Sequence, residues 1–189
     1  MKRYDLKLFV NIPTIHSERL TLRRIKPGDL EDVYEYASDS SVSEFLLWSP
    51  HPTMGYTKAY LAHLQKRYRA CDFYEWGIEF EGKMIGTVGF TSFSIEHNVG
   101  EIGYVLSSKY WGMGIGTEAV KRILEFGFEE LLLNRIEAKF MAENIKSRTL
   151  LEGLGFNYEG NLKEAVYSKG MYRDVGICAL TRSEYLRNK

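Results

Sequence analysis

The sequence of 189 residues has few of the features that mark secreted, metal-binding or membrane-spanning proteins. Its two cysteines, Cys71 and Cys178, are too few for a disulfide scaffold and lack metal-ligand spacing. The four histidines are scattered, so we expect no metal site. No apolar run reaches the ~20 residues that span a membrane, and residues 1–14 hold no apolar core of signal-peptide length. These absences favour a cytoplasmic protein without membrane partners.

The sequence also lacks an excess of either charge. Lysine plus arginine and aspartate plus glutamate each number 25, so the formal net charge at pH 7 is zero. Proteins that bind nucleic acids through phosphates usually carry a basic excess, and we expect no direct nucleic-acid partner. No linker or repeat divides the chain. Its length and its 44% hydrophobic content predict a single domain over residues 1–189.

Periodicity in the first part of the chain predicts a strand followed by helices. Residues 19–25 alternate apolar and polar side chains, as a half-buried strand does. Apolar residues then recur at helical spacing from residue 30 to residue 37 and again from about 57 to 70. Between these segments Ser41 and Glu44 have the spacing of a capping box, which predicts a short helix that begins there.

The second part of the chain predicts a strand meander and then alternating elements. The segment YEWGIEFEGKMIGTVGF reads as two strands joined at Glu81-Gly82, and VGEIGYVLSS as a third. The clearest helix is expected from Thr117 to about Leu132. A strand over 135–141, a helix from about Lys146, two strands that turn near Lys169-Gly170 and a capping box at Thr181 and Glu184 complete the order. This order predicts a mixed α/β or α+β domain.

The most informative stretch is YWGMGIGTEAV, residues 110–120, in which three glycines precede a helix. A helix N-terminus has backbone N–H groups without intrahelical partners and a dipole that favours negative charge. Glycines let an anion approach that backbone without meeting a Cβ atom. The stretch therefore predicts a phosphate site, although a turn that only packs a helix against a strand can hold the same glycines.

Two common classes of nucleotide-binding protein fit this stretch poorly. Gly114, Gly116 and Ala119 have the spacing of a dinucleotide fingerprint, but a Rossmann unit places it directly after the first strand. Here more than half of the chain comes first, including the expected meander. A P-loop needs a lysine before its serine or threonine, whereas this sequence has Gly116-Thr117. Neither class accounts for the flanking sequence.

The wider sequence resembles the GCN5-related N-acetyltransferases. WGMGIGTEA is similar to their pyrophosphate-binding motif, Gln/Arg-x-x-Gly-x-Gly/Ala. SERLTLRRIKPGD, IGTVGF, GEIGYVL and LNRIEAKFMAENIKSRTLLEGLGFNYEG also occur in the family's order, from about His16 to Leu180. The resemblance is to the ribosomal-protein N-acetyltransferase branch (RimJ/RimL type) in particular. Trp111 departs from the Gln or Arg of the motif, and we interpret it as a mark of this branch.

The resemblance implies the acyl-CoA N-acyltransferase fold, with a central mixed, mostly antiparallel sheet flanked by helices. It also implies acetyl-CoA as acetyl donor and no metal. The pyrophosphate is expected at the helix start and the pantetheine arm beside the strand of Tyr104, where a backbone N–H would stabilise the thioester oxyanion. Asn144 is expected both to cap a helix and to contact this arm. The implied cofactor-binding residues are Tyr104, Val105, Leu106, Trp111, Gly112, Met113, Gly114, Ile115, Gly116, Thr117, Asn144 and Ser147.

Two catalytic roles follow from the same resemblance. Glu101, at the start of the cofactor-binding strand, is expected to be the general base. A solvated carboxylate without a catalytic task is the alternative, and Glu75 and Glu79 are weaker candidates for the base. Ser147 is expected near the cofactor sulfur, where it would protonate the departing thiolate, with Tyr158 or solvent as alternatives.

The acceptor is expected to be a primary amine that attacks acetyl-CoA directly in a ternary complex, because neither cysteine lies at a matching catalytic position. A model α-amine has a pKa of ~7.7–8.0 and a lysine side chain one of ~10.4, so an α-amine is easier to deprotonate. This favours a protein N-terminus, of the ribosomal-protein type. Polyamines, aminoglycosides and amino acids are alternatives, and a CoA-binding sensor without catalysis is the rival from another class.

The acceptor groove is expected to involve residues far apart in the sequence. The segment FLLWSPHPTMG places Trp48 and His51 between two helices that form a wall of this groove in the family, although Trp48 suits a core position equally well. Tyr167, with Tyr172 and Arg173, flanks the last hairpin and is expected on the opposite wall. We expect a monomer or a homodimer.

Overall fold

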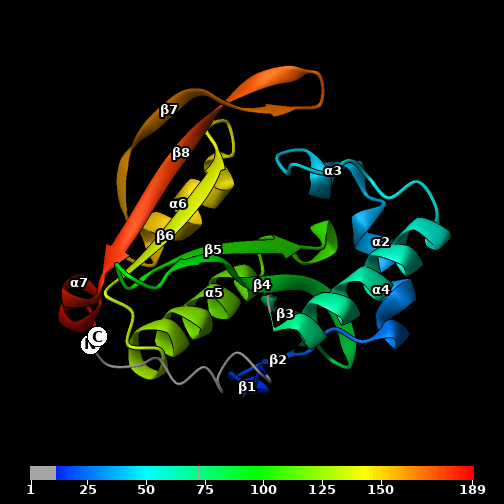
Figure 1. Cartoon of the computed structure of the whole chain (residues 1–189), viewed down its shortest axis with the longest axis horizontal. Coiled ribbons are helices and arrows are strands. Elements are labelled where there is room, and N and C mark those ends of the chain that lie inside the picture. The colour runs from blue at the N-terminus through cyan, green and yellow to red at the C-terminus, as the bar shows by residue number, and fades with distance from the viewer. Residues whose placement is uncertain (1–11, 72) are drawn as a thin grey trace.

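The computed structural model describes residues 12–71 and 73–189, so the first eleven residues of the expected domain lie outside the described part. An eight-stranded sheet runs through the molecule in the order β1-β2-β3-β4-β5-β6-β8-β7 (Figure 1). The strands are β1 (Ile15–His16), β2 (Leu20–Arg23), β3 (Tyr74–Phe80), β4 (Lys83–Ser94), β5 (Val99–Leu106), β6 (Arg135–Met141), β7 (Asn157–Ser168) and β8 (Met171–Thr181).

Helices flank this sheet. They are α2 (Leu30–Ala37), α3 (Ser40–Ser43), α4 (Met54–Ala70), α5 (Ile115–Glu125), α6 (Ile145–Gly153) and α7 (Arg182–Arg187), with short helical turns at Pro27–Asp29, Ser108–Tyr110 and Phe126–Glu130. The mixed fold with a mostly antiparallel sheet is therefore confirmed. None of the helices among the described residues is long and apolar enough to cross a membrane.

Most predicted elements are present, with shifted ends. The helix expected from residue 57 begins at Met54, because the Thr53 hydroxyl accepts a hydrogen bond from the Tyr56 N–H and caps it. The long helix begins at Ile115, and its regular part ends at Glu125, where a π-helical turn follows. The two residues of β1 were not predicted, since a strand that short has no readable period.

The capping box predicted at Ser41 and Glu44 is wrong. The carboxylate of Asp39 accepts a hydrogen bond from the Ser41 N–H at 2.9 Å, so Asp39 is the N-cap of α3. The box at Thr181 and Glu184 is confirmed as the start of α7. An acidic residue two positions earlier than the expected serine thus caps the helix, as Asp caps about as well as Ser.

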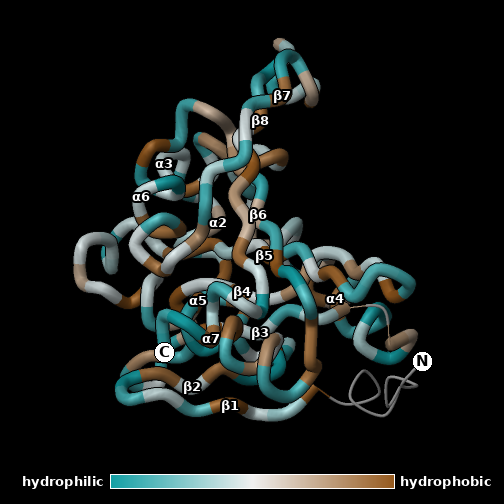
Figure 2. The backbone as a smooth tube through the Cα atoms, turned by 90° about the vertical axis from the view of Figure 1, so that its left-hand side faces the viewer, coloured by the Kyte–Doolittle hydropathy of each residue, from teal (hydrophilic) through white to brown (hydrophobic). Residues whose placement is uncertain are grey.

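One face of the sheet packs on α5 and its π-helical extension. Trp76 of β3 is 1% exposed and meets the Phe126 ring at a centroid distance of 5.5 Å. The helices α2 and α4 lie beside β3 and β4 at the other end of the molecule (Figure 1). Figure 2 shows the hairpin of β7 and β8 projecting from the rest of the chain.

The pair β5 and β6 positions the site. These two strands are parallel, and their pairing extends only from Val99–Arg135 to Ile102–Ala138. Beyond Ile102 the strands part, and Figure 1 shows β6 and β8 rising away from β5. The glycine stretch and α5 follow the free end of β5, and α6 follows the free end of β6. Both predicted cofactor segments therefore begin at this opening.

Candidate active site

A cleft with a volume of about 710 Å³ lies where β5 and β6 part. That volume falls within the roughly 300–1,000 Å³ of typical small-molecule sites. Its lining comes from α2, the loop after α3, α4, the strands β3 to β8 and the start of α6. The predicted residues that line it are Trp48, His51, Glu101, Tyr104, Val105, Asn144 and Ser147, together with the weaker candidate Glu75.

Other predicted residues lie outside this cleft. Leu106 and the stretch 111–117 do not line it; they form a second region at the end of β5. Tyr167 is 65% exposed and packs on Tyr172, with ring centroids 5.1 Å apart. Its neighbour Val166 lines the cleft in its place, because successive side chains of a strand point to opposite faces.

The second region is a helix N-terminus whose first backbone amides have no partner within the helix. Gly112 and Gly114 have φ angles of +75° and +74°, which glycine adopts without strain. The first hydrogen bond of α5 runs from the Glu118 N–H to the Gly114 carbonyl at 3.0 Å. The amides of residues 115–117 therefore precede the helical ladder and point out of its start. This geometry fits the predicted pyrophosphate site.

Arg19 and Glu118 hold this helix start against β2. The Glu118 carboxylate accepts hydrogen bonds from the Arg19 N–H at 2.8 Å, from Arg19 Nε at 2.7 Å and from the Ser17 hydroxyl at 2.8 Å. Arg19 Nη1 also donates to the Met113 carbonyl at 3.1 Å. Although burial opposes it, these bonds lower the pKa of Glu118. Sequence reasoning missed Arg19, since nothing in the sequence pairs positions 99 residues apart.

Trp111 ties the glycine stretch to the end of β5. Its indole N–H donates to the Leu106 carbonyl at 2.9 Å. The Lys146 ammonium of α6 lies 4.5 Å from the centroid of the Trp111 ring, which is the geometry of a cation–π contact. Trp111 thus connects the glycine stretch to the end of β5 and the start of α6.

Ser147 and Tyr104 form a hydroxyl pair inside the cleft. Ser147 Oγ lies 2.6 Å from Tyr104 Oη. The Ser147 N–H donates to Asn144 Oδ1 at 3.1 Å, which confirms the predicted cap of α6. Burial raises the pKa of Tyr104 to about 12, against the opposing hydrogen bond with Ser147, so both hydroxyls are protonated at neutral pH. Tyr158, the alternative proton donor, does not line the cleft.

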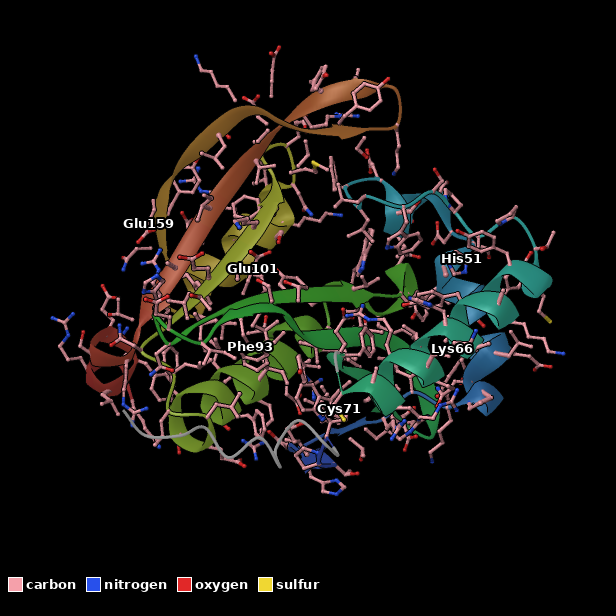
Figure 3. The ribbon with its side chains drawn as sticks, viewed as in Figure 1. His51, Lys66, Cys71, Phe93, Glu101 and Glu159 are labelled. Atoms are coloured by element: carbon pink, nitrogen blue, oxygen red, sulfur yellow. The ribbon has the colours of Figure 1, made fainter. Side chains whose placement is uncertain are left out.

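Glu101 lies at the mouth of the cleft in an ion pair. Lys139 Nζ of β6 contacts its Oε2 at 2.7 Å, and the Thr91 hydroxyl donates to its Oε1 at 3.3 Å. The same ion pair raises the pKa of Lys139. Figure 3 shows Glu101 between β5 and β6, with His51 near α2 and α4 on the other side of the molecule. Glu101 is thus held by a cation.

Glu75 lies deeper in the cleft, on β3, and is half-buried. Burial raises the pKa of its carboxyl to about 7, although the positive charge of Arg67 and a hydrogen bond with Thr87 act in the opposite direction. Glu79, the other weak candidate, is bound by Arg23 of β2 and does not line the cleft. Sequence reasoning named Glu75 only as a weaker candidate for the base, because the sequence does not show which elements cover that face of β3.

Aromatic rings form the wall of the cleft near α4. His51 is buried, and its Nδ1 lies 2.9 Å from the Thr57 hydroxyl. The rings of Trp48 and Tyr60 lie 5.5 and 5.4 Å from it, between centroids. Burial lowers the pKa of His51, so its imidazole is neutral at pH 7. Trp48 and His51 therefore supply shape and apolar surface to the cleft.

A bridge joins the β7–β8 hairpin and the segment after α3, which contribute Val166 and Phe45 to the lining of the cleft. Lys169, at the tip of the β7–β8 hairpin, donates hydrogen bonds to the carbonyls of Ser43 and Glu44, the latter at 3.2 Å. These groups come from α3 and the residue after it, on the side of α2 and α4. The bridge joins two walls that are otherwise connected through the sheet below.

The comparison with known families decides what this architecture is. Residues 19–157 match the model of the acetyltransferase (GNAT) domain, which covers both the cleft strands and the glycine stretch. The chain belongs to the GNAT acetyltransferase family. The predicted resemblance is confirmed, and the chain is an acetyl-CoA-dependent N-acetyltransferase by fold and family. Among the described residues, no group of three or more histidine, cysteine, aspartate or glutamate side chains could hold a metal ion.

Relatives of this GNAT chain match it over nearly its whole length. The N-acetyltransferase p20 of Bacillus licheniformis is 33% identical and covers 91% of this chain and 98% of its own. YdaF of Bacillus subtilis, whose name proposes a ribosomal acceptor, is 27% identical over 89% of this chain and 94% of its own. A spermidine N(1)-acetyltransferase of Escherichia coli is 25% identical over 93% and 91%. The crystal structure of a GNAT acetyltransferase from Bacillus anthracis has a TM-score of 0.80 and 28% identity, and covers 91% of this chain and all of that one.

Proposed function

We propose that this acetyltransferase acts on the α-amine of a protein or peptide N-terminus, by direct attack of the amine on acetyl-CoA in a ternary complex. The observation that supports this acceptor is the bridged cleft. Lys169 joins the hairpin tip to the segment after α3, and both the hairpin and this segment contribute to the lining of the cleft. The N-terminus of a polypeptide is narrow enough to enter such a space. An internal lysine on a folded surface would bring bulky neighbouring structure with it, so the bridge would have to open.

The donor would occupy both regions of the site. The amides of residues 115–117 and the dipole of α5 would hold its pyrophosphate, and the contacts of Arg19 with Met113 would keep that stretch in place. Its pantetheine arm would lie beside residues 104–106 of β5, in the opening where β6 no longer pairs with this strand. Thr117 lies in the first turn of α5 and Asn144 caps α6, the two helices that follow the free ends of β5 and β6.

Proton balance favours an α-amine. Deprotonation of a group with a pKa of ~7.7–8.0 at pH 7 costs about 1 kcal/mol, against about 4.6 kcal/mol for a lysine side chain with a pKa of ~10.4. A carboxylate of the cleft would take this proton, and the resemblance assigns that role to Glu101. The pair of Ser147 and Tyr104 would donate a proton to the departing thiolate, since both hydroxyls are protonated at neutral pH.

A small polyamine is the second candidate acceptor. The cleft has the volume of a small-molecule site and contains two carboxyl side chains, Glu75 and Glu101, which suit a polycation. The spermidine acetyltransferase relative supports the same alternative. By analogy with YdaF we favour the N-terminus of a ribosomal protein as the acceptor. The reaction would take place in the cytoplasm, and the enzyme would be a monomer or a homodimer.

A competition assay separates these acceptors. The enzyme would be given acetyl-CoA with equal concentrations of a free peptide, the same peptide with a blocked N-terminus and an internal lysine, and spermidine. Products would be identified by mass spectrometry. We expect acetylation of the free peptide at its α-amine. Preference for the blocked peptide would contradict the proposal, and preference for spermidine would establish the second candidate.

A further inference from the structure

The cleft contains two carboxyl groups in different surroundings, on different strands of its floor. Glu101 lies on β5 and Glu75 on β3, with β4 between them. The resemblance to the family concerns only Glu101. The register of the sheet and the contacts of each carboxyl indicate which of them is able to exchange a proton with an amine.

A row of residues without side chains connects Glu75 to the donor strand. Glu75 lies opposite Gly89 of β4, and Gly89 lies opposite Gly103 of β5. Neighbouring strands are ~4.8 Å apart, so the Cα atoms of Glu75 and Gly103 are separated by ~10 Å. Neither glycine carries a side chain, and the one side-chain atom of the described residues close to this face of Gly103 is Thr91 Cγ2, 2.8 Å from where a Cβ atom of Gly103 would lie. The Thr91 side chain therefore borders the path from the Glu75 carboxyl to the backbone next to Tyr104.

The surroundings of Glu75 suit a group that changes its protonation state. Its neighbours on the adjacent elements are Tyr36 of α2, Tyr60, Arg67 and Tyr68 of α4, and Thr87 of β4. The three tyrosines remain protonated, because burial raises the pKa of each. Arg67 acts on Glu75 through its charge, and Thr87 through a hydrogen bond. A base with a pKa near the working pH is the most efficient proton acceptor.

Glu101 is engaged differently. Its carboxylate is in contact with the Lys139 ammonium at 2.7 Å and also accepts a hydrogen bond from Thr91. Uptake of a proton by Glu101 would break this ion pair at each turnover. The same pair instead keeps a fixed polar edge where β5 and β6 separate.

We propose that Glu75 takes the proton of the acceptor amine, directly or through one water, and that Glu101 with Lys139 positions the acceptor. This inference rests on the proposed function. The ammonium of the acceptor loses one proton to the Glu75 carboxylate, and the neutral amine attacks the thioester carbonyl. The C–N bond forms, the C–S bond breaks, and the thiolate of CoA takes a proton from the Ser147–Tyr104 pair. The attacking nitrogen loses its second proton as the amide forms, and this proton returns through water to the Ser147–Tyr104 pair. Glu75 then returns its proton to solvent.

The test compares Glu75→Gln with Glu101→Gln, a matched change of a carboxyl in the same cleft. General-base assistance is typically worth 10²–10⁴-fold, so kcat of Glu75→Gln should fall within that range while the acetyl-CoA KM changes little. In the wild-type enzyme, kcat should rise as pH passes about 7, the pKa of Glu75. This step in the pH profile should be absent from Glu75→Gln. Glu101→Gln should keep the step and raise the acceptor KM.

The variant Thr87→Val distinguishes a role of Glu75 in proton transfer from a purely structural role. Its hydrogen bond lowers the pKa of Glu75, so its removal should move the step in the pH profile to higher pH while the carboxyl stays in place. Melting temperatures with and without CoA would establish that each variant folds and binds the donor.

The outcomes distinguish failure of the proposed role of Glu75 from failure of the proposed function. If wild-type enzyme acetylates an amine but Glu75→Gln keeps wild-type kcat and its pH step, Glu75 is not the base. If Glu101→Gln alone loses the step, the base is Glu101. If wild-type enzyme releases CoA with no amine of the panel, the proposed function fails instead.

Discussion

The hydroxyl of Ser147 lies 2.6 Å from the hydroxyl of Tyr104, and so joins the start of α6 to the donor strand β5. We expect Ser147→Ala and Tyr104→Phe each to lower kcat by about ten- to hundredfold, because general-acid help from a positioned group is typically worth 10²–10⁴ and solvent can replace part of it for a thiolate. The acetyl-CoA KM should change little.

The double variant tests whether these two hydroxyls act as a unit. Residues that act together give strongly non-additive losses, so Ser147→Ala with Tyr104→Phe should be little worse than either single change. Steady-state kinetics at one pH are sufficient. Independent, multiplying losses would show that the hydrogen bond between the two hydroxyls has no part in proton transfer.

A side chain at Gly116 should interfere with the donor. A Cβ atom there would lie 3.3 Å from Leu150 Cδ1 and 3.8 Å from Leu106 Cδ2, in the gap between α5, α6 and β5. We expect Gly116→Val to raise the acetyl-CoA KM more than tenfold in a protein that still folds. Gly153→Val on α6, where nothing lies within 4 Å, is the matched control and should keep its KM. Gly114 is a poorer choice, because its φ of +74° makes any substitution strained.

Glu118→Gln should loosen the helix start without touching the cleft. It removes a charge that receives three hydrogen bonds from Ser17 and Arg19, and hydrogen bonds to charged groups contribute ~1.5–3 kcal/mol. We expect a lower melting temperature at pH 7 and a several-fold weaker affinity for CoA by calorimetry. Glu125→Gln, which breaks a surface pair with Arg122 on the same helix, should change neither.

The pH dependence of this difference has a defined sign. The pKa of Glu118 is lowered by folding, so its contribution is present above the pKa of the unfolded chain and is lost as pH falls through the folded value. The melting temperatures of wild type and Glu118→Gln should therefore converge in acid. A constant difference at all pH values would show that the loss comes from packing and not from the charge.

Glu75→Gln should stabilise the fold at alkaline pH. Folding raises the pKa of Glu75 from 4.5 to about 7, so the folded chain retains a proton that the unfolded chain releases, and the carboxylate costs stability above pH 7. A pKa shift of this size lowers the free energy of unfolding by at most about 3 kcal/mol. The actual cost is smaller, because solvent reaches this half-buried group. Denaturant unfolding should show the variant more stable than wild type at pH 8 and equal to it at pH 4. Equal stability at pH 8 would contradict the raised pKa.

Local signals in the sequence predicted much of this molecule. Alternation gave the strands around Trp76 and Ile136, and Asn144 was identified correctly as a helix cap. The glycine stretch was placed at the start of a helix because its φ values and its free amides are properties of the local chain. The same signals gave the order of the elements, and the resemblance to the family supplied the fold.

Relationships across the sheet were not predictable in this way. Whether Glu75 faces Gly103 depends on the register of two strand pairs, and whether Lys139 reaches Glu101 depends on a parallel pair formed after a helix. Tyr167 was expected in the groove. The register of β7 shifts between Leu162 and Val166, and this shift determines which residues near the tip of the hairpin face the groove. Alternation shows which residues share a face of a strand, but it does not show which elements cover that face.

The contact of Lys169 with the carbonyls of Ser43 and Glu44 has a consequence for the timing of turnover. An acceptor that enters beneath this bridge has to leave beneath it as well, unless the hydrogen bonds of Lys169 break. The lifetime of these bonds would then limit how fast a bulky acetylated product departs. Tyr167 and Tyr172 of the same hairpin are each 65% exposed, so their rings are accessible to the part of a long acceptor that stays outside.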